Sequence, residues 1–83
     1  MNVQFSETIR DTHGAYMAAT CGKVQAFVSI SSHGWQVCCM NAAHRVWRGA
    51  GKWFPNKPAA LENYRSPEMR AIIEAAELEA MKS

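Results

Sequence analysis

The sequence is short of the features that mark membrane proteins and strongly nucleic-acid-binding proteins. Only 19% of the 83 residues are charged, and the net charge of +2 is too low to require a nucleic-acid partner. The chain has no apolar run near the roughly 20 residues that a membrane span needs. Its first residues lack the basic and apolar regions of a signal peptide. We therefore expect a cytoplasmic protein with no membrane partner.

The chain also has few cysteines, and their number and spacing do not suit disulfides. There are three, an odd number, and Cys38 and Cys39 are adjacent. We expect these two and Cys21 to be reduced thiols that fill small spaces in the core. Adjacent residues of a strand point to opposite faces, so Cys38 and Cys39 cannot easily share an ion. With no Cys-x-x-Cys pair and no histidine pair at helical spacing, the sequence predicts no metal site.

Catalytic and cofactor motifs are missing as well. His33 and His44 each lie five residues from the nearer of the two adjacent cysteines, but no third group is placed to orient either imidazole. The run 49–52 has glycines before a lysine, as phosphate-binding loops do. However, Trp53 follows Lys52 where Ser or Thr is required. We therefore expect neither enzymatic activity nor a bound cofactor.

What the first half of the chain does have is the period-two alternation of β-strands. Strands are predicted over residues 3–10, 15–21, 24–31 and 35–40. In the first strand the apolar residues fall mostly on odd positions, which predicts that Val3, Phe5 and Ile9 share a face. In the third, Phe27 interrupts an otherwise polar face. That interruption indicates that this face is either covered or used for binding.

The second half has the pattern of helices. Ser66, Pro67 and Glu68 form a helix start: Ser66 can accept a bond from a free amide, Pro67 fits the first turn, and Glu68 suits the positive helix end. This helix is expected to run to about residue 81. Its core-facing stripe, within an arc of roughly 100°, comprises Met69, Ile72, Ile73, Ala76 and Ala80. On the outside, Arg70 and Glu74 are four residues apart and can pair.

Between the two halves the pattern is ambiguous. Residues 41–48 could form a short helix capped by Asn41, or could continue the strand through 45–48. We favour the strand, because Val46 and Trp47 prefer it. Pro58 can then open a short helix over 59–64.

Together these elements predict one α+β domain over residues 1–83. We expect an antiparallel sheet of about four strands, with a short helix and a C-terminal amphipathic helix packed on one face. The edge of such a sheet could pair two copies of the chain into a homodimer.

The segment 44–54 is the first candidate for function, because it interleaves cations with large aromatic side chains. The candidate contact residues are Arg45, Trp47, Arg48, Lys52 and Trp53. Cations of this kind reach carboxylates or phosphates, and tryptophan supplies rigid contact area, so the partner could be a protein or a nucleic acid. In the alternative interpretation, the aromatic side chains simply cover one end of the core.

The C-terminal helix offers a second candidate surface. Residues 67–83 hold two Lys/Arg against four Asp/Glu, whereas residues 1–66 hold seven against three. The helix surface carries Glu74, Glu77 and Glu79, which could imitate the phosphates of a nucleic acid toward a basic protein groove. The alternative is an ordinary solvated helix face.

The stretch 34–80 combines a strand ending in Cys-Cys-Met-Asn with Arg-Val-Trp-Arg-Gly-Ala-Gly-Lys-Trp-Phe and Tyr-Arg-Ser-Pro-Glu-Met-Arg. It resembles small proteins of phages, prophages and plasmids, and in size and layout the chain is similar to anti-CRISPR proteins. This resemblance implies a role in the bacterial host cell. Such a protein binds a CRISPR-Cas effector protein and blocks target-DNA recognition or cleavage without catalysis. The alternative is a small nucleic-acid-binding or regulatory protein of a phage or plasmid.

Overall fold

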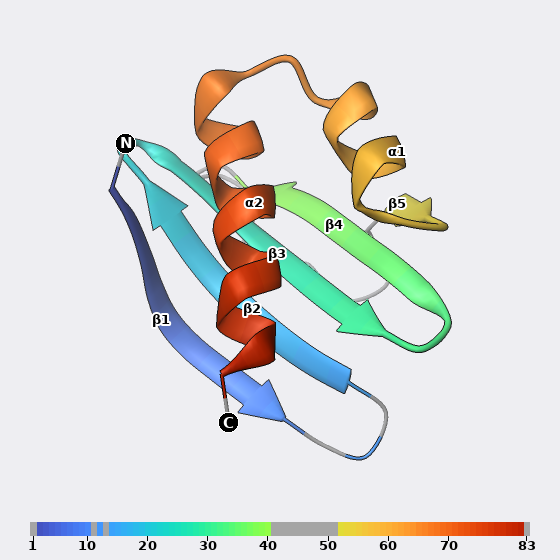
Figure 1. The fold of residues 1–83 in the computed structure, drawn as a ribbon. Coiled ribbons are helices and arrows are strands. Elements are labelled where there is room, and N and C mark those ends of the chain that lie inside the picture. The colour runs from blue at the N-terminus through green and yellow to red at the C-terminus, as the bar shows by residue number, and fades with distance from the viewer. Residues whose placement is uncertain (1, 11, 13, 41–51, 83) are drawn as a thin grey trace.

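A computed structural model of the chain describes residues 2–10, 12, 14–40 and 52–82. Its strands are β1 (Val3–Arg10), β2 (Gly14–Cys21), β3 (Val24–Ser31), β4 (Gly34–Met40) and β5 (Lys52–Phe54). Its helices are α1 (Lys57–Asn63) and α2 (Pro67–Met81). The strands form one antiparallel sheet in the order β1-β2-β3-β4-β5. Both helices lie on the same face of it (Figure 1). This arrangement confirms the predicted α+β fold.

Glycine is required at two positions in the sheet, one in a turn and one where two strands approach closely. Gly22, in the turn between β2 and β3, has a φ of +61°, a left-handed conformation that side chains with a Cβ rarely adopt. At the start of β4, a Cβ on Gly34 would lie 2.7 Å from the carbonyl oxygen of Phe54. The backbone of β5 can therefore approach β4 this closely only because position 34 has no side chain.

The core lies between the sheet and α2, which packs mainly against β2 and β3. From the strands it takes every second residue, such as Met17, Val28 and Val37, each about 1% exposed. From α2 it takes four residues of the predicted stripe, Met69, Ile72, Ile73 and Ala76, with Ala80 half-buried. The helical pattern of the sequence thus identified the core residues of α2 correctly.

Both helices begin with a capping side chain. The Oγ of Ser66 accepts a hydrogen bond from the Met69 amide at 3.4 Å, as predicted. The Oδ1 of Asn56 accepts one from the Ala59 amide at 3.0 Å, which starts α1 two residues earlier than expected. Each cap satisfies an amide that has no partner within its helix, and Pro occupies the first turn in both cases.

The predicted Arg70–Glu74 pair is wrong. Arg70 instead donates from Nη1 to the backbone oxygens of Leu61, at 2.8 Å, and Tyr64, at 3.4 Å. These carbonyls belong to the C-terminal end of α1, where the helix dipole favours a cation; the Leu61 oxygen also accepts the Tyr64 amide at 3.3 Å. Arg70 therefore joins the two helices rather than bonding along its own.

The prediction for the first strand is also wrong in part. Phe5 pairs with Ala19 and Glu7 with Ala18, so Ser6 is an extra residue that forms a β-bulge. The bulge reverses the alternation, and Ile9 lies on the other face of the sheet from Val3 and Phe5. Val3 and Phe5 pack against the core, whereas Ile9 is 53% exposed.

The remaining predictions concern the segment between β4 and β5. The expected strand through 45–48 lies outside the described residues. β5 is a separate short strand that the sequence pattern did not distinguish. In it, Phe54 is buried and its ring meets the ring of Tyr64 edge-on, at a centroid distance of 6.2 Å. The interpretation that aromatic residues of this segment cover the core is therefore correct for Phe54.

Candidate functional site

The face of the sheet turned away from the helices carries a row of five side chains, one from each strand. The register pairs Ile9 with Tyr16, Tyr16 with Ser29, Ser29 with Gln36, and Gln36 with Trp53. We call these five residues the outer row. Their neighbours along β2, β3 and β4 (Met17, Val28 and Val37) are buried on the helix side of the sheet, so alternation directs the outer row to the opposite face.

The two ends of the outer row are apolar and exposed. Trp53 on β5 is 57% exposed and Ile9 on β1 is 53% exposed. Five strands give four inter-strand spacings of about 4.8 Å, so these side chains stand about 19 Å apart. Between them Tyr16, Ser29 and Gln36 are half-buried and bring a phenol, a hydroxyl and an amide. The row therefore offers two apolar anchors with hydrogen-bonding groups between them.

No member of the outer row carries a charge. In the next register row, Glu7 pairs with Ala18, Ala18 with Phe27 and Phe27 with Cys38, so Glu7 on the edge strand β1 is the one charged residue among these four. Exposed aromatic surface with few charges is characteristic of the centres of protein–protein interfaces, where tryptophan and tyrosine are enriched. The chemistry of this face thus suits contact with another protein.

The predicted basic–aromatic surface is only partly within the described residues. Arg45, Trp47 and Arg48 lie outside them. Lys52 pairs in register with Val37, on the helix side of the sheet, and its Nζ donates to Asn63 Oδ1 at 3.1 Å. Trp53 points to the other side. The fold therefore does not bring Lys52 and Trp53 together on one face.

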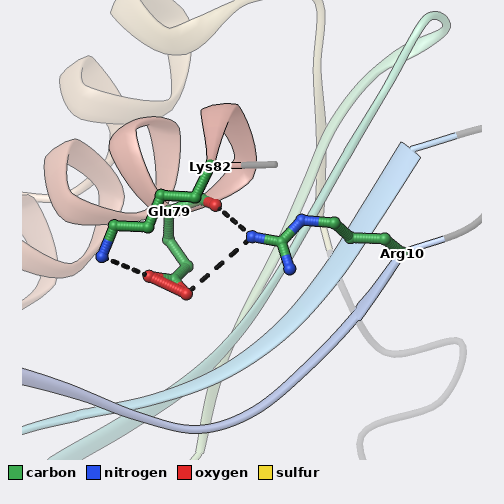
Figure 2. A network of polar contacts seen from close by, with 3 residues as sticks. All are labelled: Arg10, Glu79 and Lys82. Carbon is green, nitrogen blue, oxygen red and sulfur yellow. Dashed lines mark hydrogen bonds and ion pairs between the residues drawn. The ribbon is translucent and has the colours of Figure 1, made fainter.

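The acidic residues of α2 are placed differently from one another. Glu74 is exposed. Glu77 pairs with Lys57 on α1, with Oε1 and Nζ 3.0 Å apart. Glu79 pairs with Lys82 at 3.1 Å and lies 4.0 Å from Arg10 on β1 (Figure 2). Two of the three candidate carboxylates are thus engaged in ion pairs within the protein.

Figure 2 shows that Arg10 also binds the main chain of α2. Its Nη2 donates to the backbone oxygen of Glu79 at 2.6 Å. The same oxygen accepts the Lys82 amide at 3.2 Å, and the C-terminal end of a helix carries partial negative charge that a cation stabilises. Arg10 therefore caps the end of α2 from a strand 69 residues away in the sequence, and it holds β1 and α2 together.

Metal-binding and thiol chemistry find little support in the described part of the chain. No group of three or more His, Cys, Asp or Glu residues is arranged there to hold a metal ion. Cys21 is buried in the core, as predicted, but the prediction is wrong for Cys38, which strand alternation places half-buried on the outer face. His33 is exposed in the turn between β3 and β4, and His44 lies outside the described residues.

Sequence reasoning missed most of the outer row. It selected Trp53, but it placed Ile9 on the same face as Val3 and Phe5, and it did not select Tyr16, Ser29 or Gln36. One signal was present, because Phe27 interrupts the polar pattern of the same face. The rest of the row depends on the register between strands and on the bulge at Ser6, which a single strand's sequence does not reveal.

Within the residues that the structure describes, no helix is long and apolar enough to cross a membrane. Comparison with protein-family models finds no match to the chain, and comparisons with curated proteins and with solved structures find no significant match.

Proposed function

We propose that this protein is a non-catalytic binding protein and that the outer row contacts a partner protein. The resemblance in size and layout makes the proposal more specific: an anti-CRISPR-type inhibitor, carried by a mobile element, that acts in the cytoplasm of the bacterial host. There it binds a CRISPR-Cas effector protein and blocks target-DNA recognition or cleavage. The exposure of Trp53 at one end of the uncharged outer row is the observation that carries the proposal.

The energy available from this side chain is sufficient for a useful contact. A tryptophan buries up to about 250 Å² in an interface, and somewhat more than half of that surface is exposed on Trp53. At about 25 cal/mol per Å², covering it contributes at most about 3.5 kcal/mol. Residues that contribute 2 kcal/mol or more to binding are typically a few central aromatic or arginine side chains. Trp53 is of that type.

A nucleic-acid partner is the second candidate, because aromatic residues on a sheet also stack on bases. Affinity for nucleic acid depends on cations that neutralise phosphates. The outer row has none, and Lys52 lies on the helix side of the sheet. The described residues therefore favour a protein partner.

The test is a pull-down from the lysate of a CRISPR-bearing bacterium, with and without nuclease treatment. We expect effector subunits to be recovered in stoichiometric amounts in both arms. Recovery of nucleic acid alone, lost after nuclease treatment, would contradict the proposal and favour the second candidate. The salt dependence of affinity separates the two further, because phosphate contacts make log affinity fall steeply with log salt.

Two variants test the surface itself. Trp53→Ala should weaken partner binding by about 30-fold, the equivalent of about 2 kcal/mol. Leu78→Ala is the matched control, because Leu78 is an equally exposed apolar residue, at 65%, on α2. Binding that survives Trp53→Ala but is lost with Leu78→Ala would place the contact on the helix side instead.

A further inference from the structure

A groove opens on the helix side of the sheet, between the last turn of α2 and the ends of the strands. Its volume is about 520 Å³. The apolar lining comes from Ala15, Ile30 and Trp35 on the sheet and from Ala80 and Met81 on the helix. Arg10 and Glu77 stand at its rim. The groove is on the opposite face from the outer row, so it is independent of the contact surface proposed above.

The groove exists because the residues that face each other here are small. Near the middle of α2, Met17 on the sheet and Ile72 and Ile73 on the helix fill the space completely. At the end of the helix the corresponding positions hold Ala15 and Ala80, and two alanines leave room between the layers. Trp35, only 7% exposed, forms a rigid aromatic wall.

Arg10 brings an anion-binding group to this groove. Its Nη2 makes both contacts with Glu79, to the backbone oxygen and to the carboxylate. Figure 2 shows the other terminal nitrogen of the guanidinium directed away from Glu79. The side chain is 40% exposed, and a guanidinium has five N–H donors in a fixed fork that matches a carboxylate. Donors therefore remain for a ligand.

The carboxylates near the groove are already compensated. Glu77 pairs with Lys57 at 3.0 Å, and Glu79 pairs with Lys82 at 3.1 Å. Arg10 is a third cation beside these two pairs. Its Nη2 lies 4.0 Å from the Oε2 of Glu79, farther than the lysine nitrogens lie from their own carboxylate partners. Of the two charged residues that line the groove, Glu77 is paired with Lys57, whereas Arg10 keeps N–H donors that Glu79 does not use, so the groove favours an anionic ligand over a cationic one.

We propose that this groove binds a small apolar monocarboxylate. The apolar body lies between Trp35, Ile30 and the end of α2, and the carboxylate accepts hydrogen bonds from Arg10. Ligand sites of this kind are typically concave and mostly apolar, with a few polar groups that fix the orientation, and their volumes begin at about 300 Å³. A straight-chain acid of medium length satisfies both requirements.

The experiment is an NMR titration of the intact protein with octanoate, and with octanol and octylamine as matched neutral and cationic probes. Octanoate should shift the signals of the Trp35 indole and the Ala80 amide and bind about tenfold more tightly than octanol. Arg10→Gln should remove that tenfold preference. Arg65→Gln is the matched control, because it removes the same charge from an exposed position outside the groove lining.

A second variant tests the groove without changing Arg10, which also caps α2. Ala80→Leu fills the groove and should abolish binding of both octanoate and octanol while the amide spectrum stays dispersed. Equal affinity for octanol and octanoate, or an effect of Arg65→Gln as large as that of Arg10→Gln, would overturn the proposal. Binding of a leucine-terminated peptide without binding of octanoate would also overturn it, since the occupant would then be a chain terminus.

Discussion

The two faces of the sheet are formed by neighbouring residues of the same strands, but they differ in how far their side chains are buried. On the helix side, Met17 is almost completely buried and joins one core with Ile72 and Ile73 of α2. On the other side, the residues of the outer row remain partly or largely accessible, and Trp53 and Ile9 expose more than half of their surface. Strand alternation thus separates the side chains that stabilise the fold from those of the proposed contact surface. Mutations can therefore address one without the other.

The largest effect is expected from the core. Ile73→Ala removes a fully buried side chain from α2 and should lower the free energy of unfolding by about 3 kcal/mol, since it creates a cavity. Ile73→Val is the milder control, with an expected loss of about 1 kcal/mol. Urea titration followed by circular dichroism measures both. A loss below about 1 kcal/mol for Ile73→Ala would show that α2 does not cover the sheet as described.

The bulge at Ser6 allows the two faces to be compared within one strand. Phe5→Ala should cost about 2 kcal/mol, because Phe5 packs against the core, whereas Ile9→Ala should cost less than about 0.5 kcal/mol. The same urea titration gives both values. Equal losses would mean that β1 alternates without a bulge and that Ile9 is a core residue.

Removing the N-terminal cap of α2 should lower the free energy of unfolding by less than the core substitutions do. Ser66→Ala removes the acceptor for the Met69 amide and should reduce stability by about 1 kcal/mol. Ser66→Asp retains an acceptor and should keep most of the stability. If the two variants were equally destabilised, the hydroxyl would not be acting as a cap.

The smallest effect concerns the link between the helices. Arg70→Gln should cost about 0.5 kcal/mol, because Arg70 is exposed and its bonds to the Leu61 and Tyr64 carbonyls are only partly shielded from water. Glu74→Gln should leave the midpoint of thermal unfolding unchanged. Equal effects of the two substitutions would restore the predicted Arg70–Glu74 pair.

The parts of the fold that were predictable are those set by local sequence. The start of α2 at Ser66 and Pro67 and the buried stripe of that helix follow from residues close together in the chain. The orientation of Ile9 and the separate strand β5 depend on pairing between strands, and the bonds of Arg70 depend on how α1 and α2 pack against each other. The outer row combines all five strands, and its composition follows only from their register.

The most direct test of the outer row is hydroxyl-radical footprinting of the protein, free and bound to the effector recovered in the pull-down. Trp53 and Leu78 are both exposed and both react with the radical, so each reports on its own face. We predict that the partner protects Trp53, together with the peptide that contains Ile9, and leaves Leu78 and Met81 reactive. Protection of Leu78 and Met81 with undiminished oxidation of Trp53 would show that the helix side, not the outer row, is the contact surface.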